Sequence, residues 1–493
     1  NNNSSNFLNF LELPKNITLL ASSFAGGASG YPLCFTKFPV KSKMQIINRN
    51  INSIKFTNQK MLAATKAKYF LPYAGFFTEA AKRDIYIKKH NLKNKIDSYN
   101  FMCKKNNTDF TYLCGHSLGL QPNNTSKFVN QELEDWRNLG VLGHFDAKNP
   151  WYPYHEFLNK QSAHIVGALE EEVVVMNSLT VNLHLLLTSF YSPTKNKSKI
   201  IIETPCFPSD RYAVNSHIKN NNLDIDKTLI ELKPQRGKDI IENNHIIEKI
   251  EKYGHETQLI LISAVNYYNG QYYDIESISR EAKKHNCIIG LDLAHAAGNV
   301  KLFLHDWGID FAVWCGYKYL NGGPGAPGSA FIHKKHLENN NLKRLEGWWG
   351  HNKESRFELM DSFIPIKSAE AWQLSNPPIL SMASLWASLN IFQDIGMNSI
   401  TLKSIKLTSY LYTLLSTIDN IDILTPRDQS KRGSQISIRL NNFDKKIYKN
   451  LIKSGNICDY RAPDLLRIAP APLYNSFEDV FNFSQYLNFL IND

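Results

Sequence analysis

The stretch Gly290-Leu291-Asp292-Leu293-Ala294-His295-Ala296 decides the fold, because an apolar run ends here in an acidic side chain. Apolar runs such as Ile288–Leu293 are typical of strands that a parallel sheet buries on both faces. Asp292 would then lie at the carboxyl edge of the sheet, where such folds bind ligands. A buried carboxylate needs a partner, and a protonated pyridine nitrogen would provide one. His295 is expected to pack against that ring or to orient Asp292.

The next apolar run, Phe311–Cys315, leads to Lys318 and to the turn Gly322-Gly323-Pro324-Gly325. A lysine amine at this edge of the sheet can form a covalent bond with an aldehyde. Glycines in the turn let the backbone approach a ligand closely. The segment Asn177-Ser178-Leu179-Thr180 opens another helical run, Leu183–Phe190. Free N–H groups at such a helix start would bind a phosphate.

Phe207, in Phe207-Pro208-Ser209-Asp210, offers an aromatic face on which a ring can stack. An acid, a lysine, an anion site and an aromatic face together indicate pyridoxal 5'-phosphate (PLP). Spacing alone leaves two other interpretations open. Asp292 and His295 could be a structural hydrogen-bonded pair, or they could be two ligands of a metal ion. No third clustered ligand is visible in the sequence, and we therefore expect no metal.

Strand-like apolar runs alternate with amphipathic segments from about residue 109 onward. The runs are Ile200–Ile202, Leu259–Val265, Ile288–Leu293 and Phe311–Cys315, and the amphipathic segments include Asp239–Tyr253 and Ser277–His285. Such alternation predicts an α/β fold whose large, mostly parallel sheet has helices on both faces. From about Met397 the pattern predicts two helices around one alternating strand, Gln435–Leu440, which would form a smaller α/β domain.

The composition narrows the choice of partners. The 493 residues carry a net charge of +11, but the basic residues are spread along the chain without a basic stripe, which argues against a nucleic-acid partner. No apolar stretch approaches the roughly 20 residues of a membrane-spanning helix. The seven cysteines are scattered, without a paired spacing that would indicate disulfides or zinc. They fit a reducing compartment, and we expect a cytoplasmic protein.

Several motifs resemble the kynureninase family, in the same order, from about Asp109 to the C-terminus. They are Gly115–Pro122 (GHSLGLQP), Leu179–His184 (LTVNLH), Phe207–Asp210 (FPSD), Asp292–Ala296 (DLAHA), Tyr317–Asn321 (YKYLN), Gly347–His351 (GWWGH), Ser375–Ile379 (SNPPI) and Arg467–Ser476 (RIAPAPLYNS). The resemblance implies fold-type I PLP architecture and a homodimer with its sites at the interface. It implies a large PLP-binding domain over residues 109–396 and a small C-terminal domain over residues 397–493.

The resemblance also implies the site residues. The cofactor would be bound by Leu179, Thr180, Phe207, Pro208, Ser209, Asp210, Ser263, Asp292, His295, Tyr317, Lys318, Trp348 and Asn376. The catalytic group would be Lys318, which binds the cofactor aldehyde, Asp292, Tyr317 and Tyr268. The substrate would be bound by Arg467, which would clamp its α-carboxylate, and by His144, Ser117, Ser375 and Asn376.

The implied activity is hydrolysis of the Cβ–Cγ bond of kynurenine or 3-hydroxykynurenine to an anthranilate and L-alanine, in tryptophan catabolism and NAD biosynthesis. His144 and the Ser375-Asn376 pair resemble an aryl pocket that favours the 3-hydroxy substrate. Two alternatives are another PLP lyase or aminotransferase, such as a cysteine desulfurase, and an inactive fusion that acts as a scaffold. One departure is His116, which replaces the Asn usual in the family's Gly-Asn-Ser-Leu-Gly motif.

Residues 1–108 form an atypical N-terminal segment. The motifs Phe24–Pro32, Pro72–Ala80 and Asp84–Ile87 resemble a fragment of CMP-N-acetylneuraminate hydroxylase, over roughly residues 18–91. That family's metal-binding His cluster and Rieske Cys-His pairs are absent from this sequence. We therefore expect neither metal nor oxygenase chemistry from this segment, and we expect it to pack poorly.

Overall fold

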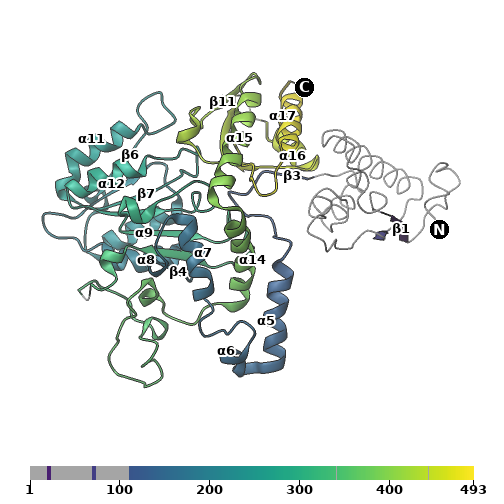
Figure 1. Cartoon of the computed structure of the whole chain (residues 1–493). Coiled ribbons are helices and arrows are strands. Elements are labelled where there is room, and N and C mark those ends of the chain that lie inside the picture. The colour runs from purple at the N-terminus through teal and green to yellow at the C-terminus, as the bar shows by residue number, and fades with distance from the viewer. Residues whose placement is uncertain (1–18, 24–68, 74–109, 340, 442–443, 493) are drawn as a thin grey trace, which may run out of the picture. The chain divides into compact units, whose positions relative to one another are not determined.

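A seven-stranded sheet forms the centre of the unit Thr111–Asp493 (Figure 1). The computed structural model describes residues 19–23, 69–73, 110–339, 341–441 and 444–492. The strand order is β4-β10-β9-β8-β7-β5-β6. Its strands are β4 (Val173–Val175), β5 (Lys199–Glu203), β6 (Leu229–Leu232), β7 (Thr257–Ser263), β8 (Ile288–Asp292), β9 (Phe311–Cys315) and β10 (Gly328–Ile332). The run from β9 to β6 is parallel, and β10 is antiparallel to both of its neighbours. The predicted α/β class and mostly parallel sheet are confirmed.

Successive residues of the central strands face two different apolar cores. In β7, Leu259 and Leu261 pack in one core, whereas Ile260 and Ile262 pack in the other. Side chains alternate across a strand, so a strand buried on both faces must be apolar throughout. This requirement produces the continuous apolar runs of the sequence.

Helices cover both faces of the sheet. Helices α8 (Leu179–Phe190) and α9 (Pro208–Asn220) pack in the core that contains Leu259 and Leu261. The opposite core contains residues of α7 (Glu156–Val166), α11 (Asn243–Tyr253), α12 (Ile275–Lys284) and α14 (Ile379–Ile395). Helix α5 (Thr125–Leu139) leads to the short helix α6 (Gly143–Asp146) at the lower edge of Figure 1.

The C-terminal part is more elaborate than the sequence indicated. Three helices, α15 (Met397–Leu415), α16 (Lys445–Lys453) and α17 (Phe477–Asn492), pack with a four-stranded antiparallel sheet. Its order is β11 (Ile421–Ile423), β12 (Ile436–Leu440), β15 (Leu465–Ile468) and β14 (Asp459–Arg461). The expectation of two helices and one strand is wrong, because the structure describes three helices and a four-stranded sheet here. Two of the strands that were missed, β11 and β14, have only three residues each and carry charged side chains. Strands this short give no periodic signal.

The segment that begins at β3 (Thr111–Tyr112) connects the two sheets. Strand β3 pairs in parallel with β13 (Asn456–Ile457), and the N–H of Ala469 donates to the carbonyl of Leu113 at 2.9 Å. Six residues further on, the N–H of Gly119 donates to the carbonyl of Tyr317 at 2.8 Å. A Cβ on Gly119 would lie 2.4 Å from the carbonyl oxygen of Lys318, so the residue at this position must be glycine. The segment thus fixes the Lys318 loop against the C-terminal sheet.

The chain divides into two compact units, Asn1–Phe110 and Thr111–Asp493. In the first unit, β1 (Leu19–Ser23) pairs in parallel with β2 (Tyr69–Tyr73). The motifs Phe24–Pro32 and Asp84–Ile87, and all of Pro72–Ala80 beyond Tyr73, lie outside the described residues. In the part of the chain that the structure describes, no helix combines the length and apolar content needed to cross a membrane.

Candidate active site

Three acidic or polar side chains close three adjacent strands of the large sheet. Glu203 ends β5, Ser263 ends β7 and Asp292 ends β8. Ser263 and Asp292 are register partners, and both the N–H and the hydroxyl of Ser263 donate to Oε1 of Glu203, the former at 3.0 Å. Carboxyl ends of parallel strands are where this class of sheet binds ligands. All three side chains are buried, so their polar groups must be satisfied locally.

Asp292 shares its site with a second carboxyl, Asp210, from the first turn of α9. The two side chains are hydrogen-bonded to each other. Burial, followed by the Asp292 charge, raises the pKa of Asp210 well above its usual range, so Asp210 is the protonated member of the pair. Burial also raises the pKa of Asp292, while the nearby charge of Lys318 and the N–H of Ala294, at 2.7 Å, oppose this rise. The pair thus presents one buried negative charge.

Lys318 lies three residues beyond β9, half-buried, and faces the same group. Its Nζ is 5.6 Å from the centre of the Phe207 ring, which precedes α9. The Tyr267 ring packs edge-on against Phe207, with ring centres 5.4 Å apart. Beside Lys318, the Tyr317 hydroxyl is hydrogen-bonded to Cys315, and burial raises the pKa of Tyr317 to about 12. The structure therefore brings the lysine, the acid pair and an aromatic face together.

The start of α8 lies next to the end of β9. Gly328 of β10 pairs with Cys315, and a Cβ on Gly328 would lie 3.1 Å from the backbone nitrogen of Leu179. The side chain of Ser178, the residue before the helix, makes no capping hydrogen bond. The first N–H groups of a helix have no partner within it. Leu179 and Thr180 therefore offer backbone donors to an anion. They lie next to the end of β9, the strand that leads to Lys318.

His295 is the next residue of the site, three positions after Asp292 in the sequence. It is buried, and no described residue lies within hydrogen-bond distance of its Nδ1. Burial, and then the charge of Lys318, lowers the pKa of His295 well below its usual range. The ring is therefore neutral at neutral pH. No hydrogen bond is formed between His295 and Asp292 among the described side chains, and packing of His295 against a ring stays a prediction.

Arg467, on β15, is buried, and only some of its N–H donors make hydrogen bonds within the protein. Its Nε donates to Oδ2 of Asp459 at 2.6 Å, its Nη2 also contacts Asp459, and its Nη1 donates to the carbonyl of Tyr267 at 2.8 Å. A guanidinium has five N–H donors, so two remain for a ligand. Tyr267, whose carbonyl accepts from Arg467, packs its ring against Phe207 beside Lys318, so the guanidinium lies on the same side of the fold as Lys318.

Other predicted residues lie apart from this group. Trp348, Ser375 and Asn376 are exposed, and His144 packs edge-on against Trp151 on the α6 side of the fold. No contact among the described residues joins any of them to Lys318 or Asp292. Tyr268 is also directed elsewhere, because its hydroxyl is hydrogen-bonded to Arg439. The exposed Ser117, in turn, donates its N–H to the carbonyl of Cys114 at 2.8 Å. Roles for these residues stay predictions.

Three residues of the site escaped the sequence analysis. Glu203 closes an apolar run, which is the same signal that identified Asp292. Tyr267 stands beside the predicted Tyr268 and is the one that contacts Phe207 and Arg467. Asp459 had no usable signal, because its strand β14 has only three residues and becomes relevant only through its contact with Arg467.

The residues fit PLP. Oδ1 of Asp210 and Nδ1 of His295 are buried without hydrogen-bond partners among the described residues, and they lie beside an acid that suits a pyridine nitrogen. The α8 start suits the phosphate, Phe207 suits the ring face, and Lys318 suits the aldehyde.

Fold and site together define a PLP-dependent enzyme of fold-type I. A family model described as "Kynureninase C-terminal domain" matches residues 400–487. A kynureninase of Myxococcus xanthus is 47% identical over 80% of this chain and 93% of its own length. Kynureninases of Koribacter versatilis (48%; 76% and 89%) and Nematostella vectensis (43%; 77% and 84%) are similar. The chain belongs to the kynureninase family, whose members are PLP-dependent hydrolases.

Solved structures share the fold at low sequence identity. A C-DES mutant with glycine covalently linked to the PLP cofactor has a TM-score of 0.66 at 15% identity, covering 77% of this chain and 96% of that one. The apo cysteine desulfurase of Thermococcus onnurineus NA1 has a TM-score of 0.64 at 17% identity, covering 79% and 96%. These solved structures show only the fold, whereas the sequence relatives show the family.

Glu203 generates a prediction on pH. Burial raises the pKa of Glu203 from 4.5 to about 7. A raised folded-state pKa stabilises the fold fully below pH 4.5, and this contribution is lost as the pH rises through 7. We expect the free energy of unfolding of the wild type to lose on the order of 3 kcal/mol more than that of Glu203→Gln between about pH 5 and pH 8. Urea titrations of both proteins across this range test it, and parallel pH profiles would contradict it.

Proposed function

We propose that this enzyme hydrolyses the Cβ–Cγ bond of kynurenine or 3-hydroxykynurenine, forming anthranilate or 3-hydroxyanthranilate and L-alanine. The observation that carries the proposal is the convergence of Lys318, the Asp210–Asp292 pair and Arg467 in a chain of this family. The reaction would serve tryptophan catabolism and NAD biosynthesis.

Each element of the site has a task in this reaction. Bound PLP supplies an electron sink for the carbon atoms of the amino acid. Asp292 would hold a proton on the pyridine nitrogen, with Asp210 fixing its orientation. Lys318 would bind the aldehyde and then move the proton at the substrate Cα. The two free donors of Arg467 would hold the α-carboxylate in a fixed geometry.

The cysteine desulfurase alternative needs a reactive thiol, and the described cysteines do not supply one. Burial raises the pKa of Cys206 and Cys114 to about 12 and that of Cys287 to about 11. Burial also raises the pKa of Cys315 and Cys458. A thiol nucleophile requires a lowered pKa, so this part of the chain favours hydrolysis over sulfur transfer. Free cysteines of this kind also support a cytoplasmic location.

The choice between the two kynurenines would depend on His144 and on Ser375-Asn376. Gly347 packs against Leu374, so Trp348 and Ser375 adjoin the same backbone contact, where a Cβ on Gly347 would lie 2.3 Å from the Leu374 Cα. We infer that His144, Ser375 and Asn376 form an aryl pocket that accepts the 3-hydroxyl group. Because it lies apart from Lys318 in one chain, it would have to be supplied by a second copy.

An exposed apolar surface supports such a homodimer. We call it the arm surface and define it by Val141, Leu142, Phe145, Trp348, Phe357, Leu359 and Met360, all exposed. Phe145 stacks on Tyr152 at 5.7 Å, Tyr152 contacts Phe357 at 5.9 Å, and Phe357 contacts Trp348 at 5.4 Å between ring centres. Through these ring contacts, the side chains of helix α6 and of the loop after β10 form one continuous surface. Exposed apolar patches of this kind mark interaction sites.

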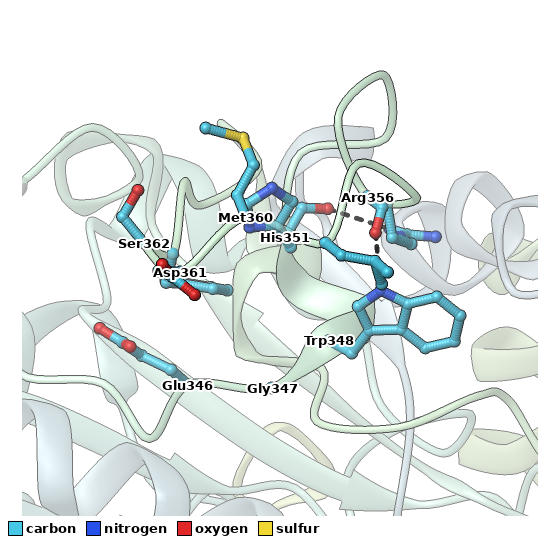
Figure 2. A pocket seen from close by; sticks show the side chains of 10 residues that line it. Glu346, Gly347, Trp348, His351, Arg356, Met360, Asp361 and Ser362 are labelled. Carbon is cyan, nitrogen blue, oxygen red and sulfur yellow. Dashed lines mark hydrogen bonds between the residues drawn. The ribbon is translucent and has the colours of Figure 1, made fainter.

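The loop of the arm surface surrounds a hollow of about 410 Å³ (Figure 2), lined among others by Trp348, Arg356 and Met360. Trp348 Nε1 donates to the carbonyl of Arg356 at 2.9 Å, which fixes the indole at the rim. Leu359 is 85% exposed and has φ of 53°, a conformation that L side chains rarely adopt. A strained and exposed leucine is better explained by a contact with another subunit than by packing within one chain.

The catalytic proposal predicts a spectrum and a product. Protein loaded with PLP should absorb visible light and release anthranilates from one or both kynurenines. Lys318→Ala should lose the lysine-linked absorbance band and about three orders of magnitude or more of activity, whereas Lys301→Ala, at an exposed site, should keep both. A band without either product would favour another PLP lyase, and the absence of any band would favour the scaffold alternative.

The dimer proposal predicts a change in association. Leu359→Lys places a charge in the arm surface and should weaken the dimer at least tenfold by sedimentation velocity. Phe489→Lys, on the exposed side of α17, should leave association unchanged. If Leu359→Lys stays dimeric at the wild-type concentration range, the interface lies elsewhere.

A further inference from the structure

His116 is held between the Lys318 loop and the strand that bears Arg467. On one side, a Cβ on Gly115 would lie 2.7 Å from the hydroxyl of Tyr474, which follows β15. On the other side, Gly119 lies against the backbone of Lys318 and Asn321. Glycines at positions 115 and 119 allow these close approaches on either side of His116.

The His116 ring is buried and has no hydrogen bond. It is 1% exposed, and neither Nδ1 nor Nε2 makes a hydrogen bond to a described residue. Oδ2 of Asp459 lies 3.7 Å from Nε2, and the ring centre is 6.0 Å from that of His295. Burial, together with the charges of Arg467 and Lys318, lowers the pKa of His116 to about 4 against the pull of Asp459. The imidazole is therefore neutral, with a single N–H to donate.

Asp459 is the residue through which His116 can act. The same oxygen, Oδ2, accepts from Nε of Arg467 at 2.6 Å and from Nε of Arg461 at 3.1 Å, and it faces His116. Burial of Asp459 opposes ionisation, but His116 and Arg467 together hold its pKa well below the usual range. Asp459 is thus a fixed negative charge beside the guanidinium.

This fixed charge creates a problem for a carboxylate ligand. A ligand that binds the two free N–H groups of Arg467 must approach a second carboxylate on the same guanidinium, and like charges in a buried site repel. The repulsion is smallest when Asp459 stays on the Nε edge and its charge is shared with donors other than Arg467. Arg461 is one such donor, and the N–H of a neutral His116 can face the same oxygen from 3.7 Å.

We propose that His116 is a positioning residue for the α-carboxylate of the substrate: its Nε2–H faces Asp459 and keeps that carboxylate on the Nε edge of Arg467, which leaves the remaining N–H groups of Arg467 for the substrate. The inference rests on the proposed function, because it takes Arg467 as the carboxylate clamp. It adds a residue and a specificity, since the effect of His116 concerns the carboxylate and not the amine of the ligand.

Two matched variants separate polarity from packing. His116→Asn retains a side-chain N–H donor, whereas His116→Leu has nearly the same volume without a donor. The PLP-loaded protein is titrated with L-alanine and with L-alaninamide, which lacks the carboxylate, and the visible absorbance of the cofactor reports binding. We expect His116→Leu to weaken L-alanine binding at least tenfold and L-alaninamide binding less than twofold, and His116→Asn to restore most of the L-alanine affinity.

Two outcomes would overturn this inference. Equal weakening of both ligands in His116→Leu, accompanied by a lower melting temperature, would mean that His116 only fills space. Unchanged L-alanine binding in His116→Leu would mean that Asp459 needs no help. Both outcomes are read from binding, so they are independent of whether the wild type releases anthranilate from kynurenine, which tests the proposed function alone.

Discussion

One buried negative charge, shared by Asp292 and Asp210, controls the arrangement of the site. Three carboxyl groups, counting Glu203, reach the same edge of the sheet, and burial raises the pKa of each. Like charges so close together cannot all be ionised. Glu203 is held by Ser263, Asp210 keeps its proton, and Asp292 remains as the group whose charge Lys318 opposes. A cationic ring nitrogen is the partner that this charge calls for.

The rest of the fold serves to place groups around that charge. Parallel strands place Ser263 and Asp292 side by side, and α9 with the residue before it brings Asp210 and Phe207 to the same edge. The segment Leu113–Gly119 ties the Lys318 loop to the strand that carries Arg467. A substrate would thus be held at its carboxylate by the C-terminal sheet and at its amine by the large sheet.

The sequence was sufficient where a single strand carried the signal. The run Phe311–Cys315 is β9, and Asp292 ends β8 as expected, because burial on both faces demands apolar residues at every position. Sequence reasoning failed for Asp459, whose significance depends on a partner eight residues later on a neighbouring strand. It also failed to separate Tyr267 from Tyr268, because only the local backbone decides which of two adjacent rings faces Phe207.

The protonation state of the cofactor ring tests the central claim most directly. The holoenzyme is prepared with PLP labelled with ¹⁵N at the pyridine nitrogen, and the nitrogen chemical shift is measured for the wild type and for Asp292→Asn. We expect a protonated ring nitrogen in the wild type, because a buried carboxylate stabilises the pyridinium form, and a deprotonated nitrogen in Asp292→Asn. A deprotonated nitrogen in the wild type, or the same shift in both proteins, would contradict the account.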